Sequence, residues 1–146
     1  MSGKIFPTAQ DAENAFYEAL ERCDLDGMMA VWAEDEEIVC VHPAGARLCG
    51  QDQVRESWAK IFAAGPRARL SIEQQVAISG MMLAVHSVYE RFTIPQAKPE
   101  QQPAPIVATN VYLRTAAGWR MIVHHASPAP AQPQPAPDDT GPKILH

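Results

Sequence analysis

Apolar residues recur at helical spacing through the first part of the chain. In residues 8–23 apolar side chains that include Phe16 repeat every three or four positions, and Thr8 is placed to cap the start. Asp24 is a second N-cap residue for the short apolar stripe that follows it. A third helical pattern covers residues 51–62. The sequence therefore predicts three helices in the N-terminal half.

The spacing of apolar residues then changes to the alternation that is typical of strands. Residues 37–43, EIVCVHP, are a short β-branched run that Pro43 stops, so one strand lies among the helices. Further strands are predicted in the second half of the chain, and a Pro-rich connection separates two of them. These long strands are expected at residues 70–78, 82–94, 106–114 and 119–127.

This order of elements predicts an α+β domain in which helices cover one face of a curved, mainly antiparallel sheet. Such a sheet often leaves a pocket at its open end. We expect one domain at residues 1–127, because the chain length suits a single core. Residues 128–146 are rich in proline and poor in apolar anchors, which favours an extended, disordered tail.

Composition excludes several classes of protein. The net charge is −5 and no basic cluster interleaves with aromatic residues, which argues against nucleic-acid binding. No apolar run approaches the ~18 residues of a membrane helix, and the first residues lack the apolar segment of a secretory signal. We therefore expect a cytoplasmic protein with no membrane partner. The 3 cysteines show no C-x-x-C spacing, so reduced thiols are expected.

Two adjacent histidines end the last predicted strand. Strict alternation places His125 on the more apolar face with Trp119 and Met121, and it places His124 on the opposite face. The pattern thus predicts that His125 points inward and that His124 faces solvent or a dimer partner. Because neighbouring strand residues diverge, the pair is not a metal clamp, and no metal or other cofactor is expected.

Residues 24–58, DLDGMMAVWAEDEEIVCVHPAGARLCGQDQVRESW, resemble the front half of NTF2-like cone proteins, in particular the SnoaL-like branch that includes ketosteroid isomerases. The resemblance extends over residues 8–127. Its anchors are DLDG, the strand that ends in Pro43, Gly50 before the third helix, and GWR in the last strand. It implies three N-terminal helices on a strongly curved sheet, a conical pocket, and often a dimer formed through the outer sheet face.

The resemblance also implies catalytic positions. In the isomerase an aspartate base stands directly before a proline, and here that place holds His42, which can also act as a base near neutral pH. The oxyanion-binding aspartate falls on Asn110, whose amide can donate a hydrogen bond. The tyrosine donor falls on Phe16, with Tyr17 about 100° round the helix. The loss of that donor argues against steroid isomerisation.

Each candidate has a structural alternative. His42 can simply end a strand, and Asn110 can satisfy a backbone group at a bulge. Tyr89 and Glu90 occupy opposite faces of their strand, so at most one of them reaches a cavity. Trp32 and Trp119 are expected in the core. The predicted pocket residues are Phe16, Trp58, Tyr89 and His125.

Two hypotheses about function stay open, and the sequence leaves open whether the protein is an enzyme. The first is a pocket that binds a small apolar molecule, with acid–base chemistry on a carbonyl compound through His42 and Asn110. The second is a non-catalytic, dimeric binding or scaffold module whose cavity is filled by its own side chains. A homodimer is expected in either case.

Overall fold

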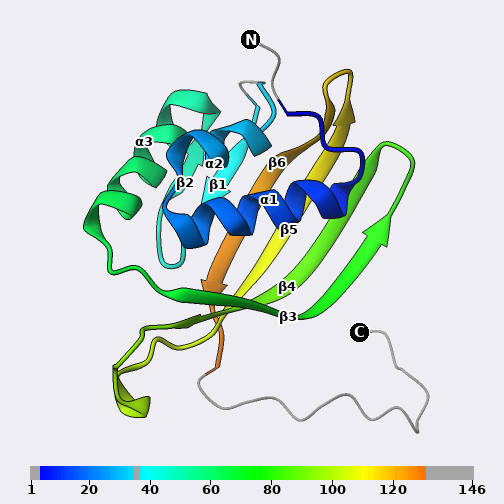
Figure 1. Cartoon of the computed structure of the whole chain (residues 1–146). Helices are drawn as coiled ribbons and strands as arrows, with labels where there is room; N and C mark the ends of the chain where they lie inside the picture. The colour runs from blue at the N-terminus through cyan, green and yellow to red at the C-terminus, as the bar shows by residue number, and fades with distance from the viewer. Residues whose placement is uncertain (1–3, 35–36, 131–146) are drawn as a thin grey trace, which may run out of the picture.

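The computed structural model of the protein describes residues 4–34 and 37–130. Its helices and strands follow the predicted order (Figure 1). The helices are α1 (Ala9–Arg22), α2 (Leu25–Val31), α3 (Gly50–Ala64) and the short 3-10 helix η1 (Pro99–Gln101). The strands are β1 (Val39–Val41), β2 (Arg47–Cys49), β3 (Arg69–Ser79), β4 (Leu83–Thr93), β5 (Ile106–Thr115) and β6 (Gly118–Pro128).

The strands form one 6-stranded sheet in the order β2-β1-β6-β5-β4-β3. All neighbouring strands are antiparallel except β1 and β6, which are parallel. Helix α1 crosses one face of this curved sheet, while α2 and α3 lie towards its β1–β2 side (Figure 1). The predicted α+β arrangement is confirmed. Strand β2 was missed, because a strand of 3 residues in a Gly-containing loop carries no periodic signal.

The helix starts follow the predicted caps. The Thr8 hydroxyl accepts a hydrogen bond from the Asp11 N–H at 3.0 Å, and the Asp24 carboxylate accepts one from the Gly27 N–H at 3.0 Å. Both caps satisfy a backbone N–H that the first helical turn leaves without a partner. The two predicted N-cap residues are therefore the residues at which α1 and α2 begin.

Two β-bulges interrupt the regular alternation of the sheet. In β3 the pairing with β4 shifts between Glu73 and Val76, and Gln74 adopts a positive φ of 52°. In β6 the pairing with β5 shifts so that Val123 and Met121 face consecutive β5 residues, which leaves Ile122 as the extra residue. A bulge reverses which side chains point inward beyond it. The two bulges therefore determine which side chains of β3 and β6 point into the interior.

Strand β6 begins where the N-terminal segment crosses it. Gly118 has a φ of +91°, and a Cβ there would lie 2.9 Å from the backbone N and O of Phe6. Glycine therefore permits the bridge between Phe6 and the start of β6. At the other end β6 reaches Pro128, which was expected to begin the tail. The rest of the predicted tail, from residue 131, lies outside the described residues.

Within the described residues, no helix has both the length and the apolar composition that crossing a bilayer requires.

Candidate functional site

A cluster of buried polar side chains lies between α1 and the inner face of the sheet. Each member is 6% exposed or less. The cluster joins α1 to the three central strands β4, β5 and β6. Its members are Glu13, Tyr17, His86, Glu90, Asn110, Tyr112 and His124, and we call them the buried polar cluster.

The carboxylate of Glu13 is the principal acceptor of this cluster. Its Oε2 accepts hydrogen bonds from the Tyr112 hydroxyl at 2.7 Å and from His86 Nδ1 at 2.9 Å. Asn110 Nδ2 approaches the same oxygen at 3.3 Å, and Gln75 Nε2 donates to Oε1 at 2.5 Å. A buried carboxylate needs such compensation, because burial removes its hydration. Glu13 therefore fixes α1 onto the sheet.

Gln75 reaches Glu13 because of the bulge in β3. The predicted alternation placed Gln74 on the apolar side of the strand with Leu70 and Val76. The shifted pairing instead brings the Gln75 amide within hydrogen-bond distance of Glu13 and of Gln10 Oε1, at 2.9 Å. The bulge thus supplies a polar partner from an edge strand.

A directed chain of hydrogen bonds runs from His124 to Glu90. His124 Nδ1 lies 2.6 Å from Asn110 Oδ1, which only accepts, so Nδ1 carries the proton. Asn110 Nδ2 donates to the Tyr17 hydroxyl oxygen at 2.8 Å, and the Tyr17 hydroxyl donates to Glu90 Oε2 at 2.7 Å. Each donor meets an acceptor, so the chain of bonds has one consistent direction.

Burial shifts the protonation of several groups in the cluster. Burial, opposed by the Tyr17 hydrogen bond and assisted by the charge of Glu13, raises the pKa of Glu90 from 4.5 to about 7. Burial and the nearby Glu90 raise the pKa of Tyr17 well above its usual value of 10.0, so Tyr17 stays a hydroxyl donor. Glu90 is therefore a carboxyl group that changes charge near neutral pH.

His124, and not His125, is the histidine that points inward. His124 is 2% exposed, whereas His125 lies on the exposed side of β6. The prediction was wrong because it assumed unbroken alternation, and the extra residue Ile122 reverses the faces after Met121. The pKa of His124 is lowered from 6.5 to about 3, chiefly by burial and to a smaller extent by the neighbouring His42 and His125.

His42 stands at the edge of the interior, next to α3. Its Nε2 lies 2.9 Å from the Ser57 hydroxyl and 3.6 Å from Cys40 Sγ. Its ring meets the Trp58 ring edge-on, with 4.6 Å between centroids. Burial lowers the pKa of His42 below 6.5, so the neutral ring predominates at neutral pH and can accept a proton.

The other predicted pocket residues divide into two groups. Phe16 and Trp58 are buried and contact each other at 5.7 Å between ring centroids, and Phe16 also contacts His124 at 4.9 Å. Tyr89 lies on the outer side of β4, because Glu90 is the buried member of that pair. The structure thus brings His42, Trp58, Phe16 and His124 together with Asn110, but it does not add Tyr89 or His125.

Sequence reasoning missed the acidic members of the cluster. Glu90 falls in phase with Ala84, His86 and Val88, the inward residues of β4, so its period-2 position was a usable signal. Glu13 had a weaker signal, since a charged residue on α1 usually faces solvent. Tyr17 was set aside as rotated away from Phe16, yet its hydroxyl is the donor that contacts both Asn110 and Glu90.

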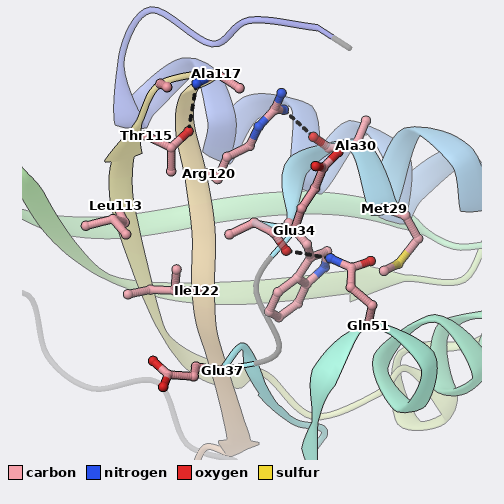
Figure 2. Close-up of a pocket in the computed structure, with 13 residues that line it drawn as sticks. Met29, Ala30, Glu34, Glu37, Gln51, Leu113, Thr115, Ala117, Arg120 and Ile122 are labelled. Atoms are coloured by element: carbon pink, nitrogen blue, oxygen red, sulfur yellow. Dashed lines mark hydrogen bonds between the residues drawn. The ribbon is translucent and has the colours of Figure 1, made fainter. Parts of the chain in front are cut away.

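A separate cavity of about 800 Å³ opens between α2, the start of α3 and the β5–β6 turn. Figure 2 shows Arg120 reaching from β6 towards Ala30, with Gln51 and Met29 on the opposite wall. The Arg120 guanidinium donates to the backbone oxygens of Ala30 and Lys4, so it holds the end of α2 and the N-terminal segment against the sheet. None of the predicted site residues lines this cavity.

In the described part of the chain, no cluster of three or more His, Cys, Asp or Glu side chains is arranged to hold a metal ion.

Comparison with known families shows to which protein family the chain belongs. The family model of the SnoaL-like domain matches residues 10–132, which is most of the chain. The chain belongs to the SnoaL-like domain family. This SnoaL-like protein has the NTF2-like cone of helices on a curved sheet, as the sequence predicted. None of the curated proteins with which it was compared matches it.

Solved structures of similar chains include relatives of this SnoaL-like protein and less similar chains that share its fold. A protein from Thiobacillus denitrificans, provisionally named a calcium/calmodulin-dependent protein kinase type II association domain, is 43% identical, with a TM-score of 0.81 over 87% of this chain and 99% of that one. An NTF2-like protein from Streptomyces avermitilis, provisionally named a dehydratase, is 29% identical, with a TM-score of 0.73 over 82% and 92%. A provisionally named ketosteroid isomerase from Parabacteroides distasonis is 17% identical, with a TM-score of 0.67 over 88% and 97%, and it shows only the shared fold.

Proposed function

We propose that this SnoaL-like protein is a self-associating binding or scaffold module, and that its partner is a second copy of the same chain. The observation that carries the proposal is a concentration of exposed apolar side chains at the β3–β4 hairpin. Of the 7 large hydrophobic residues exposed in the described part of the chain, 5 fall between positions 76 and 83. They are Val76 (60%), Ile78 (66%), Met81 (84%), Met82 (56%) and Leu83 (48%).

The edge of the sheet at this hairpin lacks the usual protection. Among residues 4–34 and 37–130, β3 is the last strand of the sheet, so one side of its backbone has no strand partner there. Residues 74–89 contain no Asp, Glu, Lys or Arg. Edge strands that remain exposed normally carry charges or prolines that oppose pairing. An uncharged apolar edge is instead suited to burial, and it is compatible with a second copy of itself, because no like charges meet.

The interior supports an association role over a catalytic one. Asn110, which stands where the isomerase resemblance implies an oxyanion donor, is fully buried, and its amide is occupied by bonds to Glu13, Tyr17 and His124. The protein from Thiobacillus denitrificans, which is 43% identical, is provisionally named as an association domain. Both observations favour a domain whose outer surface, more than its interior, meets a partner.

The test is the oligomeric state of the chain and of variants in the hairpin. We expect the wild type to elute as an oligomer in size-exclusion chromatography with light scattering, and we expect Ile78→Lys to shift it towards the monomer. Thr109→Lys, a matched charge on the exposed side of central strand β5, should leave the oligomer intact. A monomeric wild type, or an unchanged oligomer in Ile78→Lys, would falsify the proposal. Circular dichroism confirms that each variant is folded.

A second candidate function is binding of a small apolar molecule, with acid–base chemistry, at the inner end of α3. The observation that favours it is a group of perturbed and unsatisfied polar atoms. Glu90 has a pKa of about 7, and neutral His42 adjoins Trp58. The indole N–H of Trp58 is enclosed and has no hydrogen-bond partner among the described residues. Unsatisfied buried donors are rare, and a ligand oxygen would satisfy this one.

Thermal shifts with a panel of apolar carbonyl compounds test this second function. A ligand that raises the melting temperature of the wild type should lose its effect in His42→Ala and in Glu90→Gln. Tyr89→Phe serves as the control, because Tyr89 lies on the outer side of the sheet. If no compound shifts the melting temperature, or if both interior variants respond like the wild type, the interior is only structural.

A further inference from the structure

A small cavity lies between the start of α1 and the tip of the β3–β4 hairpin. It is separate from the aromatic interior, by which we mean Phe16, Trp58 and His42. Its volume is about 280 Å³. Its walls are largely apolar and come from Ala9, Ala77, Ala84 and Trp119. His86 is the only residue of the buried polar cluster that lines it, with Thr8, Gln10 and Ser79 among the other polar residues.

His86 is held in one orientation by Glu13. The Nδ1 atom of His86 lies 2.9 Å from Glu13 Oε2, and the same oxygen accepts the Tyr112 hydroxyl at 2.7 Å. Because this carboxylate oxygen accepts, Nδ1 carries a proton, and in the neutral form of such a ring the free lone pair lies on Nε2. A carboxylate that orients a histidine through Nδ1 is a common way to fix the tautomer and aim Nε2.

The Nε2 atom of His86 is available to the cavity. Within residues 4–34 and 37–130 it has no hydrogen-bond partner, since every bond of this ring uses Nδ1. The enclosed side-chain atoms that lack a partner in this part of the chain are Trp32 Nε1 and Trp58 Nε1. His86 Nε2 is not among these enclosed atoms, so within the described residues it lacks a hydrogen-bond partner but remains accessible. His86 also lines the cavity. An acceptor that is accessible from the cavity can take a hydrogen bond from a donor on a ligand.

The size and chemistry of the walls restrict the ligand. A dry apolar cavity of about 150 Å³ is enough to hold a benzene ring. A cavity of about 280 Å³ therefore accommodates one ring and a small polar group. Trp119 supplies an aromatic surface, and the alanines supply flat apolar walls. His86 Nε2 supplies a single acceptor.

We propose that this cavity is a binding site for a small aromatic compound with a hydroxyl donor, a phenol, whose O–H donates to Nε2 of His86. The site shares the β3–β4 hairpin with the apolar edge, but Ala77 and Ser79 line it and alternate along β3 with Val76 and Ile78 of that edge. The Glu13–His86 pair is its recognition element, and the alanines and Trp119 flank the ring. Because Glu13 also bonds Tyr112, the occupied site is directly linked to the buried polar cluster.

The test compares phenol with toluene, which has nearly the same shape and lacks the donor. Binding is followed by NMR of ¹⁵N-labelled histidine and of the Trp119 indole. The proposed contact requires a proton on Nδ1 and none on Nε2 of His86 in the free protein, and the histidine signals report this directly. Phenol should shift the Nε2 signal, and its affinity should exceed that of toluene by about tenfold or more, as expected for one buried hydrogen bond.

Two variants locate the site without disturbing the cluster. Ala77 faces His86 across the β3–β4 ladder, so Ala77→Leu should fill the cavity and weaken phenol binding at least tenfold. Thr109→Leu adds a similar side chain on the exposed side of β5 and should bind phenol like the wild type. The proposal is overturned by a proton on Nε2 in the free protein, by equal affinities for phenol and toluene, by the absence of phenol binding, or by unchanged binding in Ala77→Leu.

Discussion

The Tyr17 hydroxyl donates a hydrogen bond of 2.7 Å to Oε2 of Glu90, and it thereby joins α1 to β4 in the buried interior. The bond places a carboxyl group with a pKa of about 7 against a hydroxyl that does not ionise at neutral pH. The charge of Glu90 thus responds to pH while its hydrogen bond to Tyr17 is retained. Several measurable consequences follow from this pair and its neighbours.

Glu90 should make the protein less stable as pH rises towards neutrality. Its pKa is raised from 4.5 to about 7, so the folded state holds more protons than the unfolded state in this window, and stability falls as pH rises through it. The full effect is at most about 3 kcal/mol. Glu90→Gln, which keeps an acceptor for Tyr17, should lose this fall in urea unfolding curves measured across the window.

Glu56→Gln is the matched control for Glu90→Gln, because Glu56 is exposed on α3 and pairs with Lys60. Its pH dependence of stability should follow that of the wild type. A Glu90→Gln variant that still loses stability from pH 4.5 to about 7 would show that the carboxyl of Glu90 is not responsible.

His124 should have the opposite effect on stability. Its pKa is lowered from 6.5 to about 3, so the unfolded state takes up the proton first, and stability rises with pH through this range. This gain is at most about 5 kcal/mol. His124→Gln, whose amide can donate to Asn110, should reduce the loss of stability on acidification, as read from urea unfolding at each pH.

The neighbouring substitution His125→Gln is the natural control, since His125 is exposed. Its acid sensitivity should equal that of the wild type. If His125→Gln, and not His124→Gln, protects the protein from acid, the inward assignment of His124 is incorrect. The effects of His124 and Glu90 oppose each other between pH 4.5 and 6.5, so each substitution should reveal the slope due to the other group.

Loss of the Tyr17 hydroxyl should raise the pKa of Glu90 further. The Tyr17 hydrogen bond favours the ionised carboxylate and lowers the pKa that burial raises, so Tyr17→Phe removes this support. Carbon NMR titration of the Glu90 carboxyl measures the change directly. Tyr89→Phe, on the outer side of the neighbouring position in β4, should leave the titration where it is in the wild type. A lower pKa of Glu90 in Tyr17→Phe would contradict the geometry.

Glu13 should contribute more to stability than any surface carboxylate of α1. Glu13→Gln places an amide N–H₂ among the Tyr112, His86 and Gln75 donors, so at least one buried donor loses its acceptor. We expect the free energy of unfolding to fall by about 3 kcal/mol. Glu18→Gln, which only breaks an exposed pair with Arg22, should change it by about 0.5 kcal/mol or less. Equal effects of the two substitutions in chemical denaturation would refute the role of Glu13.

Much of the fold was predictable because it rests on local patterns. The caps at Thr8 and Asp24 and the apolar stripes set the first two helices, and the change to alternation after Gly65 predicted the long strands. These signals act over a few residues, so they survive without knowledge of the partner elements. The resemblance to SnoaL-like proteins added the cone and placed Asn110 in its interior.

The side chains that meet in the interior depended on events that the local pattern does not contain. One extra residue in β6, Ile122, turned His124 inward and His125 outward. Another bulge aimed Gln75 at Glu13 across 62 positions of sequence. A bulge arises from pairing with a neighbouring strand, so alternation within one strand cannot reveal it. The sequence alone determined the longer helices and strands and their order, because these carry local patterns, while the tertiary structure decided which of two adjacent histidines belongs to the core.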